Sequence, residues 1–230
     1  MPFVGNGFLA LWNDHAAEQG QYDVWHTREH VIERLGVPGF RFARRYAGGE
    51  GQLPGYFTLY GLDDVGVLES RNYRRLLANP TPWSKEMRPG MRDFLRHGCT
   101  LTATLGGGVG GLLAAGLFRL SMDDADAAAL LAEVAPLPPF TAMHLGRIEH
   151  SVSGVLFAGP PPEIGADADA ALLVEGYEPH TFRPAVASLA DRLDAAGFCH
   201  GTPHFTIYTL AFSLDAAELG QMLPLPAQVT

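Results

Sequence analysis

The sequence predicts an α+β protein built from two tandem ferredoxin-like βαββαβ units that pack sheet to sheet. The order strand, helix, strand, strand, helix, strand can be assigned twice along the 230 residues, and this order is typical of the ferredoxin-like unit. Short identities recur between the two copies at offsets of 100 and 103 residues, which indicates an internal duplication. They pair Pro38 and Phe40 with Pro138 and Phe140, and His97-Gly98 with His200-Gly201.

The first unit is assigned to residues 1–108. Apolar runs rich in β-branched and aromatic residues predict its strands, and apolar residues three or four positions apart predict its helices. Asp23 is the candidate N-cap of the first helix, and Asp63 or Asp64 is that of the second. In chain order we expect a strand at Phe8–Asp14, a helix from Asp23 to Leu35, strands at Phe40–Tyr46 and Tyr56–Leu62, a helix at Val65–Ala78, a proline-rich connection at 79–90 and a strand at Arg96–Leu105.

The second unit is assigned to residues 109–230 and follows the same order. Its first helix carries no histidine, so a site that uses helix histidines belongs to the first unit. Each sheet has helices on one face only, and the two uncovered apolar faces are expected to pack together. The expected elements are a strand at Gly111–Ser121, a helix at Asp123–Ala135, strands at Phe140–His150 and Ala171–Tyr177, a helix at Phe182–Ala196 and a strand at His204–Leu214.

Composition narrows the class of protein. A chain that is 47% hydrophobic and 18% charged can bury a large core, which excludes a disordered or fibrous protein. The formal net charge of −9 disfavours nucleic acid or an anionic membrane as a general partner. Two cysteines are too few for a disulfide framework, no signal peptide is evident, and glycines interrupt the apolar stretch 98–118. We therefore expect a cytoplasmic protein without a membrane span.

His26 and His30 are the first candidate catalytic residues. They lie four positions apart on one helix, so their side chains share a face. A helical wheel places that face opposite the apolar residues of the helix, which predicts that both histidines face solvent. Three interpretations stay open: an exposed helical face, a general acid or base, or a metal site that would need Glu29 or Glu33 as a further ligand.

Arg44, Arg45 and Tyr46 are candidate substrate-binding residues on the second strand. Strand alternation places Phe42, Arg44 and Tyr46 on one face and Arg45 on the other, so at least one arginine approaches a packed face. A buried arginine needs a carboxylate or an anionic ligand as its partner. The pattern therefore fits an anion-binding site, a structural ion pair or a half-solvated strand.

Five further positions carry weaker signals. Tyr60 lies on a strand and belongs either to the core or to a pocket wall. Trp83 follows two prolines that fix the backbone, which suits a lid, an intersubunit anchor or a plug over the sheet edge. His97 begins a strand next to a glycine, at a pocket rim or in a solvated loop. His144 and His150 are expected to share a strand face, from which a haem ligand could project.

The first half resembles the dimeric α+β barrel proteins, and in particular their ethyl tert-butyl ether degradation type. In that type a helix with an aromatic residue, and a histidine four residues later, runs into Pro-Gly and a strand. Here His30 precedes Pro38-Gly39, His26 occupies the aromatic position and Trp25 is shifted by one. The resemblance implies a barrel closed within one chain, with a homodimer still open. Members of the superfamily include cyclases, isomerases, cofactor-free monooxygenases and haem enzymes, so the fold does not select one reaction.

The predicted function is a cofactor-independent isomerase, cyclase or monooxygenase that acts on a small aromatic or anionic compound by proton transfer. His26 or His30 would be the base, Tyr60 would donate a hydrogen bond, and no metal is expected. A haem enzyme of the same fold and a non-catalytic binding or structural protein are the alternatives. The residues expected to bind the substrate are Arg44, Arg45, Tyr46, Trp83 and His97.

Overall fold

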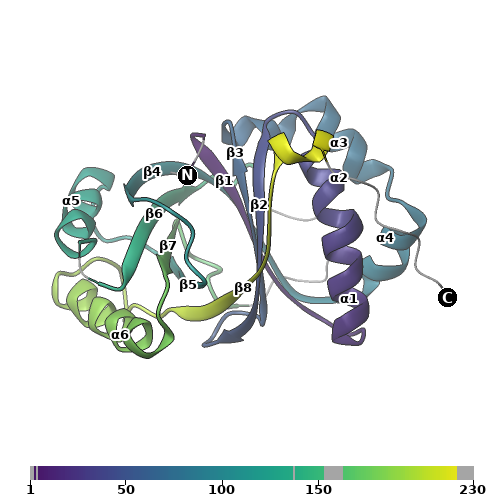
Figure 1. Ribbon diagram of the computed structural model, residues 1–230. Helices are drawn as coiled ribbons and strands as arrows, with labels where there is room; N and C mark the ends of the chain where they lie inside the picture. The colour runs from purple at the N-terminus through teal and green to yellow at the C-terminus, as the bar shows by residue number, and fades with distance from the viewer. Residues whose placement is uncertain (1–2, 4, 137, 153–162, 222–230) are drawn as a thin grey trace.

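Eight antiparallel strands close into a barrel in the computed structural model, which describes residues 3, 5–136, 138–152 and 163–221 (Figure 1). The strand order around the barrel is β1-β3-β2-β8-β5-β7-β6-β4. The strands are β1 Gly7–His15, β2 Phe40–Glu50, β3 Tyr56–Leu62, β4 Met91–Gly106, β5 Leu112–Phe118, β6 Phe140–Ile148, β7 Ala170–Gly176 and β8 Thr206–Asp215. The longer helices are α1 Gln19–Trp25, α2 Val31–Leu35, α3 Arg71–Ala78, α4 Pro82–Met87, α5 Asp124–Val134 and α6 Pro179–Ala195.

Each half of the barrel has the strand order expected of a ferredoxin-like unit. The first half runs β4-β1-β3-β2 and the second runs β6-β7-β5-β8. The halves are joined by hydrogen-bonded strands: β2 pairs with β8, and β4 pairs with β6. The predicted fold class is confirmed, and closure removes the free sheet edges that two separate sheets would present. The division into units 1–108 and 109–230 stays a prediction.

The core has an inner and an outer part. Inside the barrel, strand side chains from both halves form one cluster that includes Phe8, Trp12, Phe57, Leu173 and Tyr208. Outside the barrel, α5 and α6 cover one part of the sheet, while α1, α2 and α3 cover the part formed by the first half (Figure 1). The inner faces of the two halves therefore pack together, as the uncovered apolar faces required.

Three helical segments of the first half differ from the sequence expectation, and in the second half α6 begins at Pro179, three residues before Phe182. The first helix begins at Gln19, four residues before Asp23, and Glu18 occupies its N-cap position. The expected second helix is a 3-10 turn, Val65–Glu69, capped by Asp64, followed by α3 with Ser70 as a new N-cap. The proline-rich connection contains α4, because Thr81 accepts a hydrogen bond from the Ser84 amide and Pro82 stands at the first helical position, where its missing N–H costs nothing.

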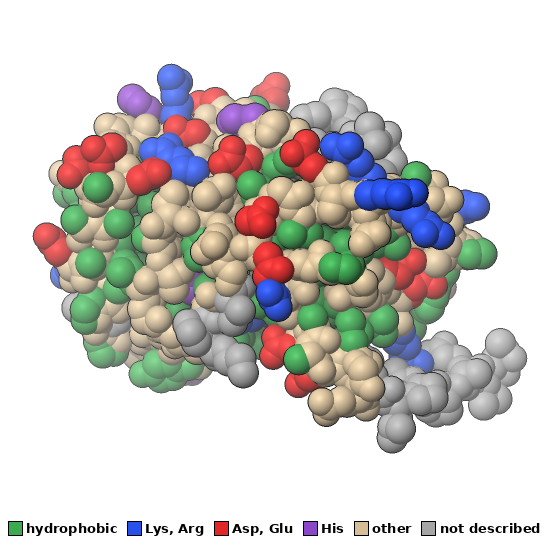
Figure 2. All heavy atoms as spheres, turned by 90° about the horizontal axis from the view of Figure 1, so that it is seen from above, with side chains coloured by type: hydrophobic (Ala, Val, Ile, Leu, Met, Phe, Trp, Pro, Cys, Tyr) green, Lys and Arg blue, Asp and Glu red, His purple; other side chains and the backbone are tan. Residues whose placement is uncertain are grey.

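The surface mixes both signs of charge. Figure 2 shows acidic and basic side chains interspersed with hydrophobic ones over one face of the molecule. No helix among the described residues is long and apolar enough to cross a membrane. The glycine-interrupted stretch 98–118 forms the end of β4 and all of β5, as its threonines and glycines indicate.

Candidate functional site

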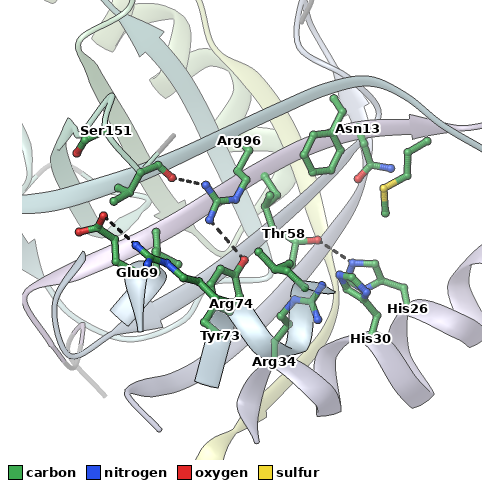
Figure 3. Close-up of a pocket in the computed structure, with 16 residues that line it drawn as sticks. Asn13, His26, His30, Arg34, Thr58, Glu69, Tyr73, Arg74, Arg96 and Ser151 are labelled. Atoms are coloured by element: carbon green, nitrogen blue, oxygen red, sulfur yellow. Dashed lines mark hydrogen bonds and ion pairs between the residues drawn. The ribbon is translucent and has the colours of Figure 1, made fainter. Parts of the chain in front are cut away.

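A cavity of about 250 Å³ lies between the helices of the first half and the outer face of β1, β3 and β4 (Figure 3). The strand register creates its floor: Thr58 and Arg96 are the two cross-strand neighbours of Leu11, so the three side chains share one face. The polar residues that line it are Asn13, His26, His30, Arg34, Thr58, Glu69, Tyr73, Arg74, Arg96 and Ser151. Its apolar walls are Leu11, Leu68, Leu77, Met91, Phe94 and Val152.

The cavity lies on the opposite face of the sheet from the barrel interior. The inner faces of the two sheets were expected to pack against each other. The inner cluster fills that space with buried side chains such as Trp12 and Phe57. The space for a ligand is therefore under the helices, and a packed barrel interior does not argue against a site.

His26 and His30 point into the cavity, so the expectation that they face solvent is wrong. They are 2% and 6% exposed. The reason is a π-helical turn, His26–His30, between α1 and α2. A π turn closes i→i+5 hydrogen bonds and holds more residues than an α turn, so residues four apart come nearer to alignment than a 100° wheel assumes. Tyr22, His26, His30 and Arg34 accordingly form one buried row at a spacing of four.

Glu29 fixes the other side of this turn. Its Oε1 atom accepts hydrogen bonds from Thr81 Oγ1 at 2.6 Å, from Ser84 Oγ at 3.2 Å and from Trp25 Nε1 at 3.2 Å. Thr81 and Ser84 belong to the start of α4 and its cap, so the carboxylate ties the π turn to the neighbouring helix. π turns are rare and are frequent at functional sites.

Both histidines are neutral bases. Burial in the apolar surroundings holds the pKa of His26 and of His30 well below the usual value, and Arg45 and Arg34 lower the pKa of His26 further. His26 Nε2 lies 3.3 Å from Thr58 Oγ1, and the two imidazole rings are 4.9 Å apart between centroids. Nδ1 of each ring is buried without a hydrogen-bond partner among the described residues. Each ring is therefore neutral and has a nitrogen that can interact with a ligand, and it would hold a proton only with an anion beside it.

Arginines supply the charge of the cavity. Arg34 is 3% exposed, and its NH1 atom has no hydrogen-bond partner in the described part of the chain. Arg96 donates hydrogen bonds to the carbonyl of Val152 and to Tyr73 Oη, as Figure 3 shows. Arg74 and Glu69 form an exposed pair at 3.5 Å, so their charges offset each other where the cavity meets solvent.

Arg44 and Tyr46 do not reach this cavity. They project into the barrel, where Arg44 NH1 and Tyr46 Oη donate to Glu175 Oε1 at 3.1 and 3.0 Å. Glu175 also accepts from the Gly110 amide at 3.0 Å. The strand alternation was predicted correctly, and the partner of the buried arginine is a carboxylate of β7 rather than a ligand.

Arg45 lies on the outer face, as predicted, but it too is paired within the protein. It donates to Asp23 of α1, and its guanidinium lies 5.0 Å from the ring centroids of both Tyr22 and Tyr56. None of these contacts involves the cavity, whose lining does not include Arg45. The structural ion pair, one of the interpretations left open, describes its position.

Tyr60, Trp83 and His97 also lie away from the cavity lining. Tyr60 is buried beneath the helices, and its hydroxyl has no partner among the described residues. Trp83 is in α4 and packs against a cluster that contains Trp25 of α1, so it joins two helices and does not cover a sheet edge, of which the closed barrel of described strands has none. His97 is not at a rim: its ring lies 6.0 Å from Trp12 inside the barrel, because it shares a strand face with Leu95 and Cys99.

The cavity residues missed in the sequence were Asn13, Arg34, Thr58, Tyr73 and Phe94. Arg34 continues the spacing of four from His26 and His30, so the sequence did contain a signal for it. Thr58 and Asn13 lie on strands, and their position beside the helix depends on the register between β1 and β3. No local pattern encodes that register across about 45 residues of intervening chain.

The histidines were also candidate ligands for a metal ion or for haem. The described residues contain no group of three His, Cys, Asp or Glu side chains able to hold a metal ion. His144 packs on Phe3 inside the barrel at 4.5 Å between centroids and lies 3.3 Å from Thr104 Oγ1, while His150 is exposed beyond the end of β6. The expectation that His144 and His150 share a strand face is therefore wrong.

Known structures share this architecture. No family model matches the chain, and no curated protein matches its sequence. An anthrone oxidase-like protein superposes with a TM-score of 0.59 and 13% identity over 93% of this chain and 94% of its own. A candidate monooxygenase of Fusobacterium nucleatum gives a TM-score of 0.55 and 8% identity, over 92% of this chain and 97% of its own.

A third similar structure is a chlorite dismutase variant from Candidatus Nitrospira defluvii in complex with cyanide. It gives a TM-score of 0.52 and 10% identity over 92% of each chain. The fold is that of the dimeric α+β barrel proteins. At these identities the likeness establishes the fold alone, so the reaction has to be inferred from the cavity.

Proposed function

We propose that the cavity is the active site of an enzyme that needs no cofactor and moves a proton from a small, largely apolar organic compound. The observation that carries this proposal is the pair of buried, neutral histidines, His26 and His30, whose rings face one apolar cavity. Catalytic bases require an acceptor nitrogen within reach of the substrate, in a site that excludes water. Isomerase, cyclase and monooxygenase reactions can each begin with this step.

The cavity residues have separate roles in the proposed proton transfer. His30 and His26 are the proton acceptors, and Thr58 orients the His26 ring through its contact with Nε2. Leu11, Phe94 and the other apolar walls hold the hydrocarbon part of the substrate and keep water from the transferred proton. The resemblance of the His30 helix and its Pro38-Gly39 turn to the ethyl tert-butyl ether degradation type supports this site within the fold. The similar structures described as oxidase-like and as a candidate monooxygenase favour an oxygenase within this range.

Proton transfer can be measured without knowing the natural substrate. Cyclic 1,3-diketones and hydroxylated aryl ketones, incubated in D₂O with the protein, exchange their acidic C–H hydrogens when a base acts on them. We expect the wild-type protein to accelerate this exchange and His30→Gln to lower the acceleration by about 100-fold or more, the usual size of a general-base contribution. His200→Gln, at an exposed position outside the cavity, is the matched control. Full exchange activity in the His26→Gln/His30→Gln double variant would refute the proposal.

A haem enzyme is a second candidate, because the cavity holds two histidines beside Arg34 and Arg96, which could pair with propionates. The fit is incomplete. A ligating histidine normally donates its second ring N–H to a protein group, and Nδ1 of both His26 and His30 lacks a partner among the described residues. We derive no step through haem. A Soret band in the purified protein that disappears in His30→Ala would favour haem, and its absence after expression with added haem would reject it.

We also propose that the two halves of the chain arose by tandem duplication. The matching strand orders of the two halves support a duplication, although the second half has no equivalent cavity histidine on α5. Because one chain supplies all eight strands, barrel closure needs no second copy. A homodimer and a cytoplasmic location remain predictions, and light scattering of the purified protein tests the first of them.

A further inference from the structure

We infer that the substrate is a weak organic acid of the phenol or enol class, which binds as its conjugate base against Arg34. This inference rests on the proposed function, because it names the substrate class of the same cavity. It starts from a guanidinium that is 97% buried and lines the cavity, with one nitrogen, NH1, that makes no hydrogen bond within the described residues. A buried charge of this kind normally has an anionic partner.

Within the described residues, the anionic partner of Arg34 is too distant for a hydrogen bond. The carboxylate that pairs with Arg34 is Glu33, with Oε2 3.9 Å from NH1, beyond hydrogen-bonding distance. Glu29, on the same helical segment, is already the acceptor of three hydrogen bonds on its Oε1. Asp23 forms an ion pair with Arg45. The charge of Arg34 is therefore left for a ligand.

The neighbouring histidines determine how that ligand becomes an anion. Both rings are neutral, because burial and the nearby arginines disfavour the imidazolium form. An acidic O–H or C–H group of the ligand gives its proton to a ring nitrogen, and the electron pair of the broken bond stays on the ligand. The net charge of the cavity does not change in this step. The new anion lies beside the imidazolium and offsets the charge that the empty cavity disfavours, while Arg34 pairs with the anion.

The walls limit the type of anion. Leu11, Leu68, Met91 and Phe94 offer no polar groups to a multiply charged head group, and Arg34 presents one unpaired nitrogen. Arg96 also lines the cavity, but it already donates to the carbonyl of Val152 and to Tyr73 Oη, so a phosphate or dicarboxylate would have to displace these partners to neutralise its second charge. A singly charged, delocalised oxyanion on a flat apolar body matches both features. The phenolate or enolate class is therefore favoured over an anion with localised charge.

A chromogenic phenol tests the inference directly. The probe is 4-nitrophenol, whose phenolate absorbs visible light, at a pH one unit below its pKa in solution. We expect the probe to bind the wild-type protein with the phenolate spectrum. We expect Arg34→Met to weaken phenolate binding by about tenfold or more, the value of one hydrogen bond to a charged group, and to bind nitrobenzene within about twofold of wild type. Arg34→Lys should retain part of the phenolate signal.

Controls separate this inference from the proposed function. Arg183→Met removes an exposed arginine of α6 that pairs with Glu50 and does not line the cavity, so the probe should bind this variant as it binds the wild type. A bound spectrum of neutral phenol in the wild type, or equal phenolate binding by a folded Arg34→Met, would overturn the inference while leaving D₂O exchange by the histidines intact. Loss of phenolate binding in Arg34→Met, together with full exchange in the double histidine variant, would support the inference and reject the proposed base.

Discussion

The carboxylate of Glu29 accepts a hydrogen bond of 2.6 Å from the hydroxyl of Thr81, the residue that caps α4. This contact joins the π turn of the first helix to the helix in the proline-rich connection. Because Glu29 points toward α4, His26 and His30, which flank it in the turn, point toward the sheet. The orientation of the candidate bases thus depends on a residue that does not itself line the cavity.

Replacing Glu29 should therefore cost stability. We expect Glu29→Ala to lower the free energy of unfolding by about 2 kcal/mol, because three donors, two of them on α4 and its cap, lose an ionised acceptor. Glu29→Gln keeps an acceptor oxygen and should lose less. Urea unfolding measures the difference. Glu69→Ala, which removes only an exposed ion pair, is the control and should stay within about 0.5 kcal/mol of wild type. A loss no larger for Glu29→Ala than for this control would contradict the role of Glu29.

The buried His97 should make stability depend on pH. Burial, with smaller contributions from His150 and Arg96, lowers the pKa of His97 to about 4, while an unfolded histidine has a pKa of about 6.5. Between these values the unfolded state binds the extra proton. The contribution of neutral His97 to the free energy of unfolding is therefore complete above about pH 6.5. As the pH falls toward 4, the free energy of unfolding decreases by about 1 kcal/mol per pH unit.

His97→Leu should flatten that slope. Leucine removes the titrating ring and both of its unpartnered nitrogens from the barrel interior. The measurement is the free energy of unfolding of the variant and of the wild type at several pH values from 7 to 4. If the difference between the two proteins stayed constant over this range, His97 would not be the group responsible. His200→Leu, at an exposed position, should leave the slope unchanged.

The Arg44 and Glu175 pair should show strong coupling. Burial raises the pKa of the Glu175 carboxyl, and Arg44 opposes that rise. Arg44→Met leaves the carboxylate buried without its counter-ion, so we expect a loss of about 3–5 kcal/mol in the free energy of unfolding. Adding Glu175→Gln should restore much of it, because the amide carries no charge, its oxygen can accept from the Gly110 amide, and its NH2 group can donate to Tyr46 Oη. A double-mutant cycle from urea unfolding measures the coupling, and additive losses would disprove it.

Dividing the chain at the predicted unit boundary should produce two fragments that fold only when they are mixed. Fragments 1–108 and 109–230 each lose the β2–β8 and β4–β6 pairings and expose the inner face of their sheet. We expect neither fragment alone to be a folded monomer, and the two together to form a one-to-one complex with the circular dichroism spectrum of the intact protein. Light scattering after gel filtration decides this. A monomeric, cooperatively unfolding 1–108 fragment would contradict the expectation.

Local patterns were sufficient for most of the fold. Strand β3 begins and ends where its run of aromatic and other apolar residues indicates, and Asp64 and Asp123 cap the helical segments that follow them. The boundaries that failed are those set by competing local interactions. Ser70 starts a new helix inside the expected one, and Thr81 with Pro82 starts a helix within a stretch rich in helix-breaking residues.

The candidate site was only partly predictable, for a geometric reason. The residue types and their spacing identified His26 and His30 as candidates, whereas an ion pair of Arg44 or Arg45 with an acidic group was only one of the interpretations that strand alternation left open. The direction of the histidines was wrong because a wheel assumes a uniform α-helix, and the π turn breaks that assumption.

The sequence by itself determined the strand and helix order, the apolar faces that must be covered, and the restriction of helix histidines to the first half. Tertiary structure decided which faces became core and which enclosed a cavity. Closure of the barrel buried the inner faces completely, so the open space could form only beneath the helices. There the register of β1 against β3 and β4 placed Thr58 and Arg96 beside the histidine row, a juxtaposition that no local segment encodes.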